Sequence, residues 1–352
     1  MRCLDLVTVL LAAASVQAVG QTSSTRQSPC ARCHQAQTLH QAQTPMGRAL
    51  LPAGENPLFK ANPKLAVRKG SFTYTVETHG DNTTYTVSDG SRSVSVPIRW
   101  TFGLRMQTWI IEQNGNYYES MVSYYPSING LETTLGDEKL TPLTLQEALG
   151  RALSQTETRQ CFSCHSSNAV SHGQLTLNSM QPGVTCEHCH SGTSAHLLDA
   201  VQGNFDSAPP SLKKLSSEKI SNFCGQCHRS WATVVRTGTH GVANVRFQPY
   251  RLANSKCFDG ADGRISCIAC HDPHNDLVQD ASSYDAKCTA CHQVKTAGQK
   301  NLEASSAKSC PVATAKCTGC HMPKVGINSA AGPLIFTDHT IRRALPGEAY
   351  PN

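Results

Sequence analysis

Cys161-Phe-Ser-Cys164-His165 is one of seven Cys-x-x-Cys-His copies that decide the fold of this 352-residue chain. Composition alone would give about 0.03 copies, so the repetition has a chemical cause. In chain order, motifs 1 to 7 are Cys30-Ala-Arg-Cys33-His34, Cys161-Phe-Ser-Cys164-His165, Cys186-Glu-His-Cys189-His190, Cys224-Gly-Gln-Cys227-His228, Cys267-Ile-Ala-Cys270-His271, Cys288-Thr-Ala-Cys291-His292 and Cys317-Thr-Gly-Cys320-His321.

This spacing lets two thiols form thioether bonds to one porphyrin edge, while the adjacent histidine binds the iron. The motifs therefore predict seven covalently attached haem c groups, with the motif histidines as proximal ligands. Zinc binding, a disulfide framework or a redox dithiol would use Cys-x-x-Cys pairs. None of these alternatives explains a histidine after every second cysteine.

Composition agrees with a core built partly from cofactor, because only 6% of the residues are aromatic and 39% are apolar. We expect a mostly irregular and α-helical multihaem cytochrome c array with an inserted small antiparallel β subdomain. The predicted divisions are a signal peptide at 1–18, an N-terminal haem 1 segment at 19–64, the β subdomain at 65–135 and a six-haem domain at 136–352.

The β subdomain falls in the long gap between motifs 1 and 2. Ser71-Phe-Thr-Tyr-Thr-Val-Glu77 alternates in the manner of a strand. Residues 108–113 and 117–124 flank the sequence Asn114-Gly115-Asn116, which predicts a hairpin. We interpret this subdomain as a platform that covers one side of the haem array, or alternatively as a module for partner docking.

Helices are predicted in front of three motifs. Thr144-Leu-Gln-Glu147 resembles a capping box, and Leu145, Leu149 and Leu153 follow at helical spacing toward motif 2. Shorter helices are expected from Ser216 into Cys224 and from Ala281 into Cys288.

The first residues predict export. Arg2 precedes an apolar run at 6–16, and Val16-Gln17-Ala18 is a small-residue cleavage pattern. The run is too short to span a bilayer, and no transmembrane segment is expected in the mature chain. An N-terminal anchor or buried helix is the alternative. We expect a periplasmic or extracellular location.

Two cysteines remain once Cys3 is removed with the signal peptide and the motif cysteines are assigned. They are Cys257 and Cys310. A pair in an oxidising compartment predicts a disulfide, and two unpaired buried thiols are the alternative.

The net charge of +6 does not indicate a nucleic-acid partner. Each ferric haem adds one positive charge and two propionates, so seven haems bring the protein to about −1. No long basic run is present.

The second ligand of each iron decides function, because a vacant face permits substrate binding and two strong ligands favour electron transfer. The chain has 15 histidines, of which seven are proximal, and His188 lies inside motif 3. Seven candidates for the distal faces remain: His40, His79, His172, His196, His240, His274 and His339. The equal numbers favour bis-histidine ligation throughout.

Three candidates stand out. His274 and His196 follow their motifs too closely to reach the opposite face of the same ring, so we expect them to bind neighbouring irons. His339 stands beside Asp338, a carboxylate placed to orient its ring. The thioether of Met46 is a rival ligand for haem 1.

Three segments carry a resemblance to a known superfamily. Cys186-Glu-His-Cys-His-Ser-Gly-Thr-Ser-Ala-His196, Cys267 to His274, and Cys317 to Lys324 followed by Phe336-Thr-Asp-His339 are the segments concerned. The first two resemble elements of the superfamily of nitrification tetrahaem cytochromes, hydroxylamine oxidoreductase and multihaem nitrite reductases. The third resembles the C-terminal element of many exported multihaem cytochromes. The resemblance implies distal roles for His196 and His339. Ser191-Gly-Thr replaces the usual Gly-Pro-Gly, and no motif ends in lysine, as the catalytic motif of pentahaem nitrite reductases does.

We therefore expect an exported heptahaem electron carrier rather than an enzyme. Its partners would be other cytochromes or quinol-linked membrane complexes. One alternative is an oxidoreductase with one open haem that acts on a nitrogen or sulfur oxyanion. Another is a homo-oligomer or conductive filament, in which a histidine of one copy binds a haem of the next.

Overall fold

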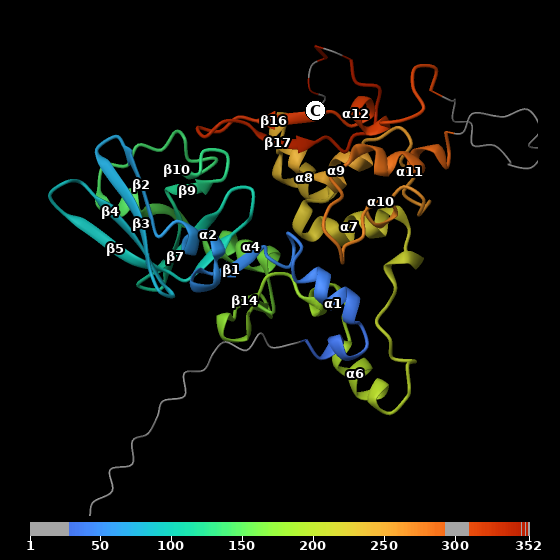
Figure 1. Ribbon diagram of the computed structural model, residues 1–352, viewed down its shortest axis with the longest axis horizontal. Helices are drawn as coiled ribbons and strands as arrows, with labels where there is room; N and C mark the ends of the chain where they lie inside the picture. The colour runs from blue at the N-terminus through green and yellow to red at the C-terminus, as the bar shows by residue number, and fades with distance from the viewer. Residues whose placement is uncertain (1–27, 293–309, 346, 349, 351–352) are drawn as a thin grey trace, which may run out of the picture.

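The computed structural model describes residues 28–292, 310–345, 347–348 and 350, so the predicted signal peptide lies outside the described residues. The architecture is mixed α/β. An antiparallel β region occupies the N-terminal part, and short helices that carry most of the motifs occupy the C-terminal part (Figure 1).

A four-stranded antiparallel sheet forms the outer layer of the β region. Its order is β2 (Lys64–Lys69), β3 (Phe72–His79), β4 (Asn82–Ser88) and β5 (Ser93–Ile98). Buried and exposed residues alternate along β3, as the period of two of a strand with one buried face requires. The predicted strand at 71–77 is confirmed.

A second, five-stranded sheet has the order β1 (Leu50–Pro52), β6 (Trp100–Phe102), β7 (Thr108–Gln113), β8 (Asn116–Ser120) and β11 (Gly150–Leu153). Asn114 and Gly115 turn the β7–β8 hairpin with φ of 53° and 77°. Both values are positive, as a type I′ turn requires, so the predicted hairpin is confirmed. Strands β1 and β11 lie outside residues 65–135, and the predicted domain boundaries stay a prediction.

The first four residues of β7 are buried on both faces, which explains the apolar run from Trp109 to Ile111. Trp109 and Ile111 join the core between the two sheets, where Tyr74 and Tyr85 also lie. Ile110 faces the other way and packs in a second core with Phe162, from the helix of motif 2. The five-stranded sheet therefore supports a motif directly.

The predicted strand 117–124 is divided in the structure. Strand β8 ends at Ser120, and β9 (Val122–Tyr125) pairs with β10 (Gly130–Thr133) instead. The Ser120 hydroxyl donates to the Val122 carbonyl at 2.9 Å, which holds the chain at the point where it leaves the first sheet.

The helix predicted from Thr144 through Leu153 is wrong in its second half. Helix α3 (Leu145–Leu149) stops at Gly150, where the chain becomes extended and pairs with β8 as β11. A new helix, α4 (Gln155–His165), then begins with a full capping box of Ser154 and Glu157 and carries motif 2 at its C-terminal end.

The remaining helices are short and mostly carry or flank motifs. Ser216 caps α7 (Ser217–His228), so the predicted helix into Cys224 is confirmed. The predicted helix into Cys288 is confirmed by η6 (Ala281–Tyr284) and α11 (Asp285–Thr289). The remaining helices of the described residues are η1 (Pro29–Arg32), α1 (Gln35–Gln41), η2 (Ala53–Glu55), α2 (Pro57–Ala61), η3 (Leu177–Ser179), α5 (Cys186–Cys189), α6 (Thr193–Val201), η4 (Leu212–Lys214), α7 (Ser217–His228), α8 (Trp231–Thr237), η5 (Gly241–Arg246), α9 (Gln248–Ala253), α10 (Cys267–Cys270), η6 (Ala281–Tyr284), α11 (Asp285–Thr289) and α12 (Cys317–His321).

Small antiparallel pairs complete the fold. They are β12 (Ser166–Ser167) with β15 (Gln181–Pro182), β13 (Val170–Ser171) with β14 (Gln174–Leu175), and β16 (Lys324–Ile327) with β17 (Leu334–Thr337). Among the described helices, none is long and apolar enough to cross a membrane.

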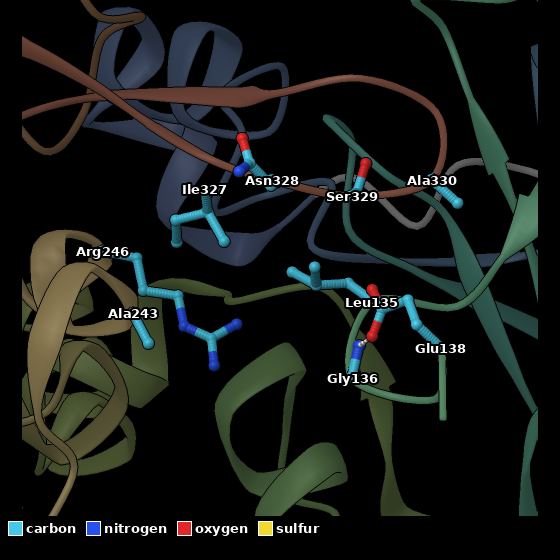
Figure 2. Close-up of a pocket in the computed structure, with 9 residues that line it drawn as sticks. All are labelled: Leu135, Gly136, Glu138, Ala243, Arg246, Ile327, Asn328, Ser329 and Ala330. Atoms are coloured by element: carbon cyan, nitrogen blue, oxygen red, sulfur yellow. Dashed lines mark hydrogen bonds between the residues drawn. The ribbon is translucent and has the colours of Figure 1, made fainter. Parts of the chain in front are cut away.

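The β16–β17 hairpin connects the two parts of the molecule, since it extends from the helical side toward β9 and β10 (Figure 1). The Ser127 hydroxyl donates to the Ala331 carbonyl at 3.3 Å, and the Arg105 guanidinium donates to the Ile335 carbonyl at 3.2 Å. A cavity of about 430 Å³ lies beneath the hairpin, and the Arg246 side chain reaches into the space between Ile327 and Leu135 (Figure 2).

Candidate functional site

Each motif forms one turn of helix, which gathers its two thiols and its imidazole. In motif 1 the backbone N–H of His34 donates to the Cys30 carbonyl at 2.8 Å, and His190 makes the same bond to Cys186 at 2.8 Å. This turn is the local geometry that thioether attachment with a proximal histidine needs.

A backbone carbonyl fixes the tautomer of three predicted iron ligands. The Nδ1 of His165 donates to the Ala49 carbonyl, that of His321 to the Arg342 carbonyl and that of His339 to the Thr337 carbonyl, each at 2.9 Å. A carbonyl can only accept, so Nδ1 carries the proton and Nε2 keeps its lone pair for a metal.

Burial favours the same ligating form. It lowers the pKa of His165 and lowers the pKa of His339 to about 4, because a charged imidazolium is disfavoured away from water. Both rings are therefore neutral at pH 7, as metal binding requires.

Two proximal histidines face a candidate distal histidine from another segment. The ring centroids of His190 and His274 are 6.0 Å apart with the ring planes 10° apart. The centroids of His271 and His339 are 6.2 Å apart with the planes 47° apart. Two imidazoles on opposite faces of one iron have centroids about 6.2 Å apart, from metal–nitrogen bonds of about 2 Å and ring radii of about 1.1 Å.

The thiols of separate motifs lie against one another. The Cys164 thiol contacts the Cys227 thiol, which lowers the pKa of Cys164 to about 6 and raises the pKa of Cys227. The direct contacts are Cys30 with Cys186, Cys164 with Cys227, Cys224 with Cys267, and Cys288 with Cys317.

Two further approaches connect these pairs. Cys189 lies close enough to Cys224 for the Cys224 thiol to raise the pKa of Cys189. The Cys270 thiol likewise raises the pKa of Cys288. The motifs thus follow one another in the order 1, 3, 4, 5, 6 and 7, with motif 2 beside motif 4. Sequence spacing gave no signal for this order.

The other distal candidates have different surroundings. The His40 Nδ1 lies 2.7 Å from the Asn275 Oδ1, so α1 touches the segment that follows motif 5. The His196 Nδ1 is buried and has no hydrogen-bond partner among the described residues. His79 and His172 lie exposed at hairpin ends, and His240 is exposed in front of η5.

Met46 is half-buried, and its carbonyl accepts from the Val184 N–H at 3.0 Å. That bond places the Met46 backbone close to the strand that leads into motif 3. The ligand roles of Met46 and of these five histidines stay predictions.

Cys257 and Cys310 are both exposed, and the structure does not join them. Cys257 instead lies near enough to Cys270 of motif 5 for its charge to raise the pKa of that thiol. The disulfide stays a prediction.

Asp338 does not orient the His339 ring directly, as its position had suggested. The His339 ring donates to the Thr337 carbonyl, while the Asp338 carboxylate forms an ion pair with the Arg251 guanidinium. Sequence reasoning missed Arg251, because 87 residues separate it from Asp338 and no motif surrounds it.

The residues fit covalently attached haem. The paired thiols and the imidazoles whose Nδ1 is hydrogen-bonded, which leaves Nε2 to bind iron, are the donor set that the group uses. Among the residues that the structure describes, no group of three or more carboxylate, thiol or imidazole side chains forms a separate metal site.

Comparison with known proteins gives one family match and one structural match. Residues 133–191, which contain motifs 2 and 3, match the protein family described as Cytochrome c554 and c-prime. Among solved structures, the outer cell wall cytochrome OcwA aligns over 89% of this chain and 78% of that chain, with a TM-score of 0.49 and 12% sequence identity. No curated protein matches the chain. The seven motifs and the family match over residues 133–191 together support a multihaem c-type cytochrome, which implies covalently attached haem and electron transfer.

Proposed function

We propose that the chain is an exported heptahaem electron carrier whose irons are mostly held between two histidines. One haem c would attach at each motif, and each would supply a one-electron centre. The chain's own residues fix the irons, set their spacing and keep water from the buried ligands.

The observation that carries this proposal is the pairing of His190 with His274 and of His271 with His339. Each proximal imidazole has a second imidazole at the spacing of a six-coordinate iron. A saturated iron cannot bind a substrate without losing a ligand, so this pairing favours electron transfer over catalysis.

The motif contacts support transfer along the chain. Direct contact between thiols of separate motifs implies that the attached groups approach closely, because each thioether fixes a porphyrin edge at its sulfur. The order 1, 3, 4, 5, 6, 7 then gives a row with two ends, and motif 2 gives a third end beside motif 4.

The remaining assignments belong to the same proposal. Distal ligands are proposed among His40, His79, His172, His196 and His240, with Met46 as a rival for motif 1. The proposed location is the periplasm or the cell exterior, and the proposed partners are other cytochromes or quinol-linked membrane complexes.

Electron paramagnetic resonance of the oxidised holoprotein tests the proposal. Bis-histidine ferric haems are low-spin, so we expect low-spin signals that account for all the iron. A high-spin signal would instead favour the oxidoreductase with an open haem. Long polymers in electron micrographs of the same sample would favour the filament.

A further inference from the structure

A buried cluster of charges connects two of the proposed iron ligands. Asp338 is 0% exposed and Arg251 is 1% exposed, and they form a bidentate pair with distances of 2.9 Å from Nε to Oδ1 and 3.0 Å from Nη2 to Oδ2. The Nη1 of Arg342, a side chain that is 16% exposed, adds a third bond to Oδ2 at 2.8 Å.

One arm of the cluster leads to His339. The Thr340 N–H donates to Asp338 Oδ1 at 3.0 Å, and the Thr340 hydroxyl donates to the Arg251 carbonyl at 3.0 Å. Ser255 donates to the His339 carbonyl at 3.1 Å. The backbone on both sides of His339 is therefore fixed, and its ring centroid lies 6.2 Å from that of His271.

The other arm leads to His321. The Arg342 carbonyl accepts the Nδ1–H of His321, while the Arg342 guanidinium binds Asp338. One residue thus holds the proximal imidazole of motif 7 with its backbone and the cluster with its side chain. The Arg342 backbone N–H also donates to the His321 carbonyl at 3.1 Å, which closes the contact on both sides.

Resting on the proposed haem array, we propose that Asp338 is a positioning residue that sets the ligation of two irons at once. Through Thr340 it holds His339 toward the iron of motif 5, and through Arg342 it holds His321 toward the iron of motif 7. Its buried negative charge also acts on both centres, because charges in a poorly hydrated interior are weakly screened.

The buried charge of Asp338 predicts the direction in which the haem midpoint potentials shift. The ferric state carries one more positive charge than the ferrous state, so a buried carboxylate stabilises the ferric state and lowers the midpoint potential. Asp338→Asn removes that charge and should raise the potentials of two haems. Arg342→Gln removes a positive charge from the same cluster and should lower the same two potentials.

The experiment is a spectropotentiometric titration of the holoprotein, combined with low-temperature electron paramagnetic resonance. We expect Asp338→Asn and Arg342→Gln to shift two of the seven haem potentials in opposite directions and to change the low-spin signals of the same two haems. Arg342→Lys keeps the charge and should restore potentials close to those of the wild type. Asp89→Asn is the matched control, because Asp89 pairs with Arg92 in the β region, away from the motifs.

Shifts of equal sign in both variants, or unchanged potentials in both, would overturn the positioning role. If Asp338→Asn does not fold, Arg342→Gln provides the test alone. That variant keeps the Arg251–Asp338 ion pair and the backbone carbonyl of residue 342. A downward shift confined to two haems then supports the role, and no shift contradicts it. Failure of the bis-histidine proposal is read separately, from a high-spin signal in the wild-type protein.

Discussion

The imidazole of His274 lies 6.0 Å from that of His190, centroid to centroid, although the two residues belong to different motif segments. His274 follows its own motif histidine by three residues and faces the motif 3 histidine instead. The backbone N–H of His274 donates to Asp272 Oδ1 at 2.9 Å, which forms the turn that directs the ring away from motif 5.

Replacing His274 tests this pairing. His274→Ala should leave the iron of motif 3 five-coordinate, so one of seven ferric haems should become high-spin. Added imidazole should restore the low-spin signal by filling the vacant position. His188→Gln is the control, since His188 lies inside motif 3 but outside the proposed ligand set. A fully low-spin His274→Ala protein would show that another residue binds this iron.

Phe162 anchors motif 2 in the β region. Its ring is 0% exposed and makes edge-to-face contacts with Trp100 at 5.6 Å and Phe102 at 5.2 Å. Phe162→Ala should lower the free energy of unfolding by about 3–5 kcal/mol, from lost burial and the cavity left behind. Urea unfolding of the holoprotein measures this cost. Leu143→Ala, at a side chain that is 86% exposed, should change little, and an equal loss in both variants would refute the anchoring role.

The N-terminus of α4 depends on Ser154. Its hydroxyl accepts from the Glu157 N–H at 3.2 Å, and the Glu157 carboxylate accepts from the Ser154 N–H at 2.9 Å. Ser154→Ala should cost about 1 kcal/mol, because a helix N–H loses its partner. Ser163→Ala, later in the same helix, should cost less in the same unfolding experiment. A smaller loss for Ser154→Ala than for Ser163→Ala would contradict the capping role.

Asp137 should make stability depend on pH. Burial, and secondarily Glu119, raises the pKa of this carboxyl to about 6, and its Oδ2 is buried without a partner among the described residues. Between about pH 4 and pH 6 the folded state keeps a proton that the unfolded state releases, so this group's contribution to stability falls as pH rises.

Asp137→Asn removes that dependence. Its stability relative to the wild type should increase from pH 4 to pH 6 and stay constant above, as thermal unfolding across this range can measure. Asp89→Asn should show a constant difference from the wild type across this range, because N–H donors from Arg92 and Ser91 lower the pKa of Asp89 and place its titration in the folded state below pH 4. A stability difference for Asp137→Asn that is flat from pH 4 to pH 6 would contradict the raised pKa.

The proposed Cys257–Cys310 disulfide has a direct chemical test. Thiol titration of the denatured, non-reduced holoprotein should find no free thiol, since the motif cysteines are consumed as thioethers. Two free thiols would leave the pair unbonded, as both are in the structure.

Local features of the sequence predicted much of the β region and of the helices before the motifs. The Asn114-Gly115 turn and the alternation in β3 are encoded by neighbouring residues, and both were predictable. The end of α3 at Gly150 was not, because pairing of Gly150–Leu153 with β8 outweighs the helical spacing of the leucines. The motif histidines were equally predictable as haem ligands, since the Cys-x-x-Cys-His pattern itself identifies them.

The long-range part of the site could not be predicted. Nothing near His274 in sequence identifies His190 as the ring that it faces, and nothing near Arg251 identifies Asp338. These contacts depend on how distant turns pack, which periodicity and spacing do not encode.

Quantitative electron paramagnetic resonance of the fully oxidised holoprotein tests the central claim most directly. We predict low-spin ferric signals that integrate to seven irons per chain, with no high-spin component. A high-spin signal at one iron equivalent or more would contradict an array of saturated haems and would mark the open site of an enzyme.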